Sequence, residues 1–233
     1  MLPEYNASLP LFAEYGLNVS CETYAKLEEY AAFLVAYNTR VNLTSVTEGE
    51  EILRKHFLDS LLLEVYCREQ MQDSLLDIGS GAGFPGVPIS LLRPDLSVTL
   101  LDSLQKRITF LEALRDRLAA SYTAVHGRAE QYVREHREAF GCVTARAVAA
   151  LPMLAEYSLP YVRVGGYWLA MKGPNEPIRP ALQAIRVLGG ELVDTIRYHL
   201  PGGDARVIYV VKKISHTPTK YPRNSGQIKQ KPL

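Results

Sequence analysis

The stretch Asp77–Gly86, with the sequence DIGSGAGFPG, decides the fold class of this chain. It follows a short apolar run, residues 74–78, that is typical of a buried strand. Glycine lets the backbone turn sharply and lets a ligand approach the main chain closely. Residues 81–86 spell G-x-G-x-x-G, the fingerprint of nucleotide-binding strand–turn–helix units. The stretch therefore predicts a ligand-binding turn between a strand and a helix.

Strand and helix patterns alternate after this turn. An apolar run over 96–101 ends at Asp102, and leucines at helical spacing follow it, with Ser103 as the expected N-cap. Further strands are expected at residues 122–126, 142–145, 166–171, 191–199 and 206–213. A hairpin-like connection joins the last two. Repeated strand–helix units imply a parallel sheet with helices on both faces, and the hairpin adds one antiparallel strand. We therefore expect an α/β fold with a mostly parallel, seven-stranded sheet.

Helical patterns also precede the glycine turn. Ser20 can cap a helix that ends near Asn38, and Thr47 with Glu50 fits a capping box for a second helix. We predict three parts in the chain. They are a helical N-terminal extension over 1–66 that packs on the core, a ligand-binding domain over 67–213 and a basic tail over 214–233.

The composition is typical of a globular protein from a reducing compartment. Hydrophobic residues make up 47% of the 233 residues and charged residues 22%. The three cysteines lie far apart and show no zinc-binding spacing. No stretch approaches the length that crosses a membrane. We expect a cytoplasmic, monomeric protein without a metal.

The end of the chain is basic. Seven lysines and arginines, and no acidic residue, follow Asp204, although the net charge of the whole chain is only +1. Such a segment is either a contact for an anionic polymer or a solubilising end. Lys220 and Arg223 flank Tyr221, whose ring could stack on an RNA base.

Two features of the glycine turn argue against a nicotinamide dinucleotide. Asp77 places a carboxylate where a pyrophosphate would be repelled, and Phe84 fills the turn where a pyrophosphate needs bare backbone. A carboxylate suits a ligand with a cationic ammonium, such as the methionine part of S-adenosylmethionine. Asp102, about 20 residues beyond the turn, stands where an acid can accept hydrogen bonds from ribose hydroxyls.

Other candidate residues lie at expected strand ends, where open α/β sheets bind their ligands. Ala129 and Glu130 follow the third strand, where an adenine edge would pass. Arg146 ends the fourth strand and Lys172 the fifth, and either cation could meet an anionic substrate. His56 falls among the apolar positions of its helix, so we expect it to be a core or interface residue.

Several longer segments resemble the family of ribosomal RNA small subunit methyltransferase G, also called glucose-inhibited division protein B. The resemblance covers nearly the whole chain after about Val35. Its most specific parts are the phenylalanine–proline glycine loop and the tail that begins KYPR at Lys220. The matching segments are NLT (42–44), HFLDSL (56–61), LLDIGSGAGFPGVPISLLRPD, LLDSLQKRITFLEAL, GRAEQ, ARAVAAL and KYPRNSGQIKQKPL.

The resemblance implies a Rossmann-like methyltransferase that transfers a methyl group from S-adenosylmethionine to N7 of a guanine in bacterial 16S rRNA, near the decoding centre. It implies cofactor contacts at Gly79, Phe84, Asp102, Ala129, Glu130 and Arg146. We add Asp77 and Gly81 to the cofactor site from the glycine turn. We expect RNA contacts, in naked rRNA or in the small ribosomal subunit, at Arg40, Asn42, Lys172, Lys220 and Arg223.

The chemistry of guanine N7 agrees with the residues present. N7 carries a lone pair and no proton, so its methylation needs no general base, and the sequence shows no acid–base dyad, catalytic triad or metal cluster. Catalysis would come from orientation, with Arg146 as a positioning residue. Two alternatives remain open at this point: a nicotinamide-dependent oxidoreductase and a non-catalytic RNA-binding module on the same fold.

Overall fold

The sheet of this protein has seven strands and confirms the predicted α/β class. The structure is a computed structural model that describes every residue except Ala147. The strands lie in the order β3-β2-β1-β4-β5-β7-β6, and only β7 runs antiparallel to its neighbours. The strands are β1 (Ser74–Ile78), β2 (Ser97–Asp102), β3 (Tyr122–His126), β4 (Phe140–Arg146), β5 (Val162–Lys172), β6 (Gly190–His199) and β7 (Ala205–Lys213).

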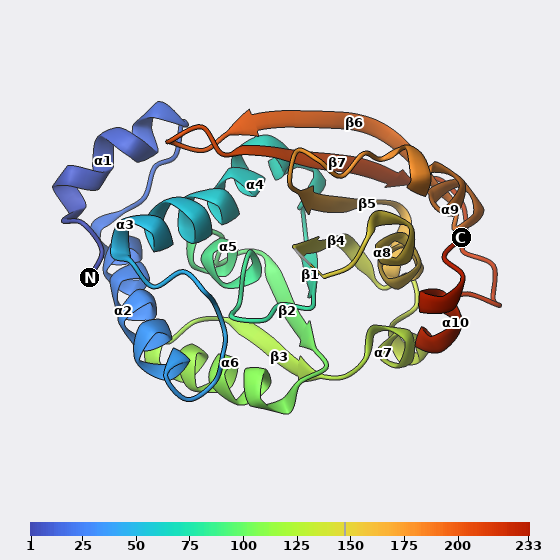
Figure 1. Cartoon of the computed structure of the whole chain (residues 1–233), viewed down its shortest axis with the longest axis horizontal. Coiled ribbons are helices and arrows are strands. Elements are labelled where there is room, and N and C mark those ends of the chain that lie inside the picture. The colour runs from blue at the N-terminus through green and yellow to red at the C-terminus, as the bar shows by residue number, and fades with distance from the viewer. Residues whose placement is uncertain (147) are drawn as a thin grey trace.

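Helices cover both faces of the sheet (Figure 1). One face carries α1 (Tyr5–Glu14), α2 (Cys21–Asn38), α3 (Gly49–Ile52), α4 (Asp59–Cys67), α5 (Gly86–Leu92) and α6 (Gln105–Leu118). The other face carries α7 (Ala129–His136), α8 (Leu151–Ser158), α9 (Leu182–Val187) and α10 (Ser225–Gln230). Each face buries its own hydrophobic cluster against the sheet. Because helices cover both faces, the central strands β1 and β4 are buried along nearly their whole length rather than at alternate residues.

The N-terminal helices pack directly on the sheet domain. Leu27 and Leu34 of α2 and Phe57 belong to the same buried cluster as Leu100 of β2. Phe33 of α2 stacks on Phe110 of α6, with ring centroids 5.4 Å apart. Apolar positions at helical spacing therefore mark the face of α2 that packs on the core.

Two predicted helix caps are wrong. The N-cap of α6 is Leu104 rather than Ser103, because the buried Asp102 carboxylate accepts a hydrogen bond from the Leu104 N–H at 2.9 Å. The N-cap of α3 is Glu48 rather than Thr47, and no side chain caps that end. Ser20, in contrast, caps α2 as predicted, since its side chain accepts a hydrogen bond from the Thr23 N–H.

Two elements were not expected. Residues Leu53–Leu58 form a π-helical segment between α3 and α4, a rare geometry that often occurs at functional sites. The basic end of the chain folds back onto the molecule and forms α10, whose N-cap Asn224 accepts a hydrogen bond from the Gln227 N–H. None of the described helices is long and apolar enough to span a bilayer.

Candidate functional site

The glycine turn lies at the carboxyl ends of the strands, beside the point where the strand order reverses between β1 and β4. Its glycines Gly79, Gly81 and Gly83 all have positive φ. A Cβ on Gly79 would lie 2.7 Å from the Val148 side chain, and one on Gly86 would lie 2.2 Å from that of Leu100. Glycine is therefore favoured in this turn for two reasons: the backbone adopts positive φ, and neighbouring side chains leave no room for a Cβ.

Asp77 lies beneath the turn and has no exposed surface. Its Oδ2 accepts a hydrogen bond from the Gly86 N–H at 2.9 Å, while its Oδ1 has no partner among the described residues. Burial raises the pKa of this carboxyl to about 7, although the Gly86 N–H and Arg146 oppose the shift. Because Asp77 has no exposed surface, its predicted contact with the ammonium group of a ligand stays a prediction.

Asp102, the last residue of β2, stabilises the turn by hydrogen bonds. Its Oδ2 accepts hydrogen bonds from the Gly81 N–H at 2.9 Å and from Arg107 at 3.1 Å, and its Oδ1 accepts one from Leu104. The side chain is 2% exposed. The structure therefore assigns Asp102 and Gly81 a supporting role, and the predicted ribose contact of Asp102 stays a prediction.

A cleft of about 260 Å³, which we call the glycine-loop cleft, opens in front of the turn. Ile78 and Leu101 give it apolar walls from β1 and β2, and Met153 and Tyr157 of α8 close it from the other side. Three predicted cofactor residues line it, namely Gly79, Ala129 and Glu130. The Glu130 carboxylate accepts a hydrogen bond from Arg128 at 2.6 Å. Apolar walls beside exposed loop backbone suit a flat, partly polar ligand such as a nucleoside.

Phe84 lies in the middle of an aromatic stack behind the turn. Its ring lies 5.2 Å from that of Tyr30 and 4.5 Å from that of His56, nearly parallel to both. The Arg146 guanidinium lies 5.1 Å from the centre of the Phe84 ring. Phe84 is 6% exposed, so its ring is covered by these neighbours and does not face solvent.

A second and larger cleft of about 470 Å³, which we call the arginine cleft, lies beyond β4. Arg146 is held there by Asp59, whose Oδ2 accepts its hydrogen bond at 2.9 Å, and by the Lys55 carbonyl. Tyr198 donates a hydrogen bond to the other oxygen of Asp59 at 2.8 Å. The lining residues are Val46, Lys55, His56, Asp59, Arg146, Met171, Lys172, Gly173, Glu176, Tyr198 and Arg206.

His56 is mostly buried, as the sequence suggested, but it also lines this cleft, which the sequence did not indicate. The π-helical segment places its ring between Phe84 and the cleft. Its Nε2 lies 2.8 Å from the Thr44 hydroxyl. Burial and the nearby Arg146 lower the pKa of His56 to about 3, so the imidazole is neutral at pH 7. The sequence offered one signal for this role, the spacing of His56 and Asp59 on one helical face.

The predicted RNA contacts lie in different places. Lys172 lines the arginine cleft, and Arg40 and Asn42 are exposed on the loop before α3. Lys220 is exposed on the opposite side of the site, whereas Arg223 forms a two-pronged ion pair with the fully buried Glu156. The structure therefore uses Arg223 to hold the tail against α8.

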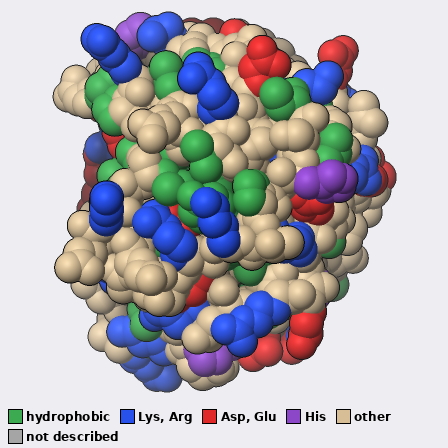
Figure 2. Space-filling model, turned by 90° about the vertical axis from the view of Figure 1, so that its right-hand side faces the viewer, with side chains coloured by type: hydrophobic (Ala, Val, Ile, Leu, Met, Phe, Trp, Pro, Cys, Tyr) green, Lys and Arg blue, Asp and Glu red, His purple; other side chains and the backbone are tan. Residues whose placement is uncertain are grey.

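The interpretation of Tyr221 as a stacking platform is wrong, since its ring is 8% exposed and belongs to the core. Another basic residue of this segment, Lys213, is fully buried and bonded to the Leu159 and Val162 carbonyls. The face around α7 and α10 nevertheless bears many Lys and Arg side chains (Figure 2). The basic end is thus partly structural and partly a positive surface.

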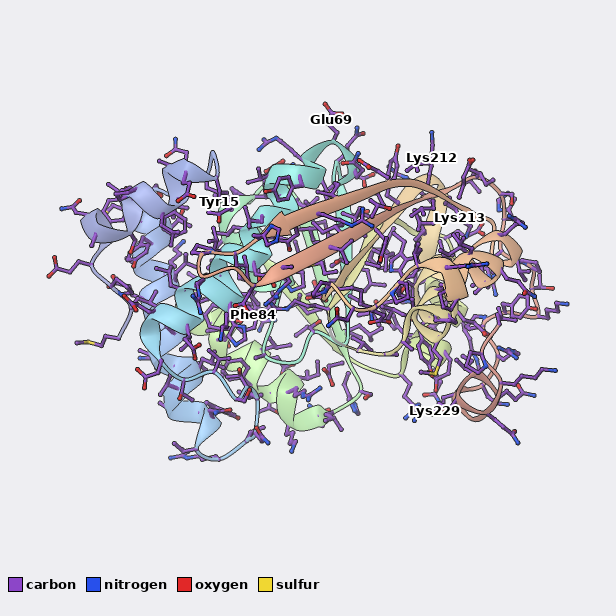
Figure 3. The ribbon with its side chains drawn as sticks, turned by 45° about the horizontal axis from the view of Figure 1, so that its top comes forward. Tyr15, Glu69, Phe84, Lys212, Lys213 and Lys229 are labelled. Atoms are coloured by element: carbon purple, nitrogen blue, oxygen red, sulfur yellow. The ribbon has the colours of Figure 1, made fainter. Side chains whose placement is uncertain are left out.

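No cluster of His, Cys, Asp and Glu that could hold a metal ion occurs among the residues for which the structure gives positions. Figure 3 shows Phe84 in the interior of the molecule and Lys229, which lines the glycine-loop cleft from α10, near its lower edge in that view. Arg146, the last residue of β4, lines the arginine cleft, and Val148 and Ala149, which follow β4, line the glycine-loop cleft. The two clefts thus lie near the same end of β4.

Comparison with known proteins places the chain in a family. Residues 23–188 match the family model described as rRNA small subunit methyltransferase G. A protein of that name from Desulfitobacterium hafniense is 44% identical over 242 residues, which cover all of both chains. Another from Clostridium tetani is 40% identical, over 94% of this chain and 95% of its own.

The fold is also that of solved structures at low sequence identity. A putative O-methyltransferase from Klebsiella pneumoniae superposes with a TM-score of 0.56 over 89% of this chain and 96% of its own, at 13% sequence identity. The structure of M. jannaschii TYW2 in complex with AdoMet superposes with a TM-score of 0.52 over 65% of this chain and 76% of its own, at 12% sequence identity. At that identity the likeness concerns the fold alone.

Proposed function

The chain belongs to the rRNA small subunit methyltransferase G family, and we propose that it transfers a methyl group from S-adenosylmethionine to N7 of one guanine of bacterial 16S rRNA, near the decoding centre. Family membership removes the nicotinamide-dependent alternative. The observation that carries the finer proposal is the pair of clefts on one rim of the sheet, one lined by Val148 and Ala149 just after β4 and the other by Arg146 at its end.

We assign the cofactor to the glycine-loop cleft. The exposed backbone at Gly79, the apolar walls and the unpartnered Asp77 Oδ1 below the turn fit a nucleoside joined to a methionine. When bound, S-adenosylmethionine supplies an electrophilic methyl group on a cationic sulfur. Phe84 and the neighbouring turn keep water away from the side of the cleft that faces Arg146.

We assign the target base to the arginine cleft. His56 offers a flat, neutral ring that already continues the stack of Tyr30 and Phe84, and a purine can lie on it. N7 uses its lone pair to bond to the methyl carbon, the carbon–sulfur bond breaks with its electrons left on sulfur, and no proton moves. The protein needs to orient the base rather than ionise it, which agrees with a neutral His56.

The target guanine must leave any RNA helix to reach this cleft. N7 faces the deep, narrow major groove of A-form RNA, which side chains do not enter. We propose that the guanine lies in a loop or is flipped out, while Arg40, Asn42 and Lys220 contact the surrounding RNA as exposed polar groups. We further propose that the protein acts on the small subunit or its rRNA as a monomer in the cytoplasm, and that residues 1–66, 67–213 and 214–233 form its extension, domain and tail.

The test is transfer of labelled methyl from S-adenosylmethionine to small-subunit particles that lack the modification. The label is mapped by reverse transcription after cleavage specific for N7-methylguanine. We expect one labelled guanine near the decoding centre. Label on another atom would overturn the N7 assignment, and binding of both ligands without transfer would favour a non-catalytic RNA-binding module.

A further inference from the structure

Lys172 and Glu176 form an ion pair at the edge of the arginine cleft. The Lys172 Nζ lies 3.0 Å from Glu176 Oε2 and also donates a hydrogen bond to the Ala149 carbonyl. Glu176 Oε1 accepts a hydrogen bond from the Leu151 N–H at 2.8 Å, which ties the carboxylate to the start of α8. Both side chains line the cleft, so their positions are set by the protein before any substrate binds.

Each partner keeps hydrogen-bonding capacity. An ammonium has three N–H donors, and the described residues use two of those on Lys172. A carboxylate has about four acceptor positions, and those contacts occupy two of them on Glu176. The Lys172 side chain is 5% exposed and that of Glu176 is 36% exposed. The free acceptor positions of Glu176 are therefore accessible from the cleft, and Lys172 holds the carboxylate in place.

This pattern matches one purine. Along its Watson–Crick edge guanine presents the O6 acceptor, the N1–H donor and the N2 amino donor, in that order. Adenine presents an acceptor at N1 and has no amino group at C2, so a carboxylate at this edge would oppose N1 and find no donor beside it. Resting on the function proposed above, we propose that Glu176, held in place by Lys172, recognises the N1–H and the N2 amino group of the target guanine and excludes adenine.

The position of Glu176 also suits the product. Methylation at N7 leaves the purine with a positive charge and makes its N1–H a stronger donor. A carboxylate bonded to N1–H and to the N2 amino group gains strength as this charge develops, so the contact favours the transition state over the bound substrate.

Glu176 fits this role better than Asp59, the other carboxylate of the cleft. The Asp59 side chain is 4% exposed and is already bonded to Arg146 and Tyr198. The Glu176 side chain is 36% exposed. Asp59 therefore positions Arg146, and Glu176 is the carboxylate that a base can reach.

The test combines one protein variant with one change in the RNA. Inosine keeps O6, N1–H and N7 of guanine but lacks the N2 amino group. Particles are reconstituted with guanosine or inosine at the mapped target, and kcat/KM is measured for the unchanged protein and for Glu176→Gln. We expect inosine to lower kcat/KM of the unchanged protein about 10- to 100-fold, the range of a hydrogen bond to a charged group.

The decisive quantity is the ratio of guanosine to inosine rates for each protein. Because both rates come from the same preparation, this ratio is independent of how much protein is folded. We expect Glu176→Gln to lower the rate on guanosine and to bring the ratio close to one. A ratio unchanged by Glu176→Gln would overturn the proposal, even if the variant were slow, because a merely structural role lowers both rates equally.

Two controls keep this test separate from the proposed function. Glu69→Gln is a matched change at an exposed residue next to the opposite end of β1, far from Phe84 in Figure 3, and should keep the full guanosine preference. N7-specific cleavage of the guanosine product shows independently whether the reaction itself is as proposed. Equal rates of the unchanged protein on guanosine and inosine, with N7 methylated, would overturn the Glu176 contact and leave the methylation intact.

Discussion

The glycine-loop cleft and the arginine cleft lie on one rim of the sheet but are built in different ways. The glycine-loop cleft is formed by turns that directly follow β1, β2 and β3, with mostly apolar walls. The arginine cleft collects charged side chains from the π-helical segment, from α4 and from the ends of β4 to β7. The cleft that we assign to the cofactor is thus formed largely by local backbone geometry, and the cleft that we assign to the base by side chains that only the tertiary structure assembles.

The largest effect should come from Arg146, which lines the arginine cleft. Arg146→Ala leaves the buried Asp59 with the longer contact to Arg206, at 3.8 Å, as its remaining ion pair among the described residues. We therefore expect the free energy of unfolding to fall by about 3 kcal/mol and methylation to be lost. Urea unfolding and methyl transfer measure the two effects.

Arg117→Ala is the matched control for Arg146→Ala. It breaks an exposed pair with Glu29 and should cost less than about 1 kcal/mol. Equal losses of stability in the two variants would contradict the structural role of Arg146 in the arginine cleft.

A substitution in the turn should damage the glycine-loop cleft alone. Gly79→Ala adds a Cβ 2.7 Å from Val148 at a positive φ, and we expect it to weaken S-adenosylmethionine binding about 10- to 100-fold. Gly16→Ala imposes a similar φ with nothing within 4 Å, so it should cost stability but not affinity. Calorimetric titration distinguishes them, and a Gly79→Ala variant that binds the cofactor normally would remove the turn from the site.

Asp77 should make stability depend on pH. Its pKa is raised from 3.8 in the unfolded chain to about 7, so the folded state holds the proton more tightly. The contribution of Asp77 to the free energy of unfolding is therefore complete below about pH 4 and falls as the pH rises towards 7. Above pH 7 it no longer changes with pH. The slope is at most about 1.4 kcal/mol for each pH unit.

Asp77→Asn should remove this slope, whereas Asp116→Asn, at an exposed acid, should keep it. Unfolding curves between pH 4 and 8 test this. If the ammonium of the cofactor contacts Asp77, saturating S-adenosylmethionine should lower the apparent pKa. A slope that survives Asp77→Asn would show that another group causes it.

The smallest effect is expected at the basic end of the chain, outside both clefts. Lys220→Ala should change stability by less than about 0.5 kcal/mol, because the side chain is exposed. If Lys220 contacts a phosphate, the slope of log affinity for rRNA against log salt should fall by about one. Lys26→Ala on α2, next to Glu22, should leave the slope unchanged. An unchanged slope for Lys220→Ala would remove it from the RNA contacts.

Sequence patterns were sufficient for the class of the sheet, for its single antiparallel strand and for the turn between β1 and α5. They failed where a tertiary contact replaced a local one. Ser103 was the better cap by residue type, but the Asp102 carboxylate bonds to the start of α6 instead. The patterns also did not reveal that Arg223 pairs with the buried Glu156, distant in the chain, and its predicted RNA contact stays a prediction.

The sequence by itself determined the glycine turn and the strands around it, because strand period, glycine spacing and helical spacing are local properties that act over a few residues. Only the tertiary structure decided the composition of the arginine cleft. Arg146, Asp59 and Glu176 come from separate elements, and their meeting depends on the strand order and on a π-helical turn. The positions of these charged side chains are set by their burial and by their ion-pair partners in the folded protein. Spacing along the chain does not contain this information.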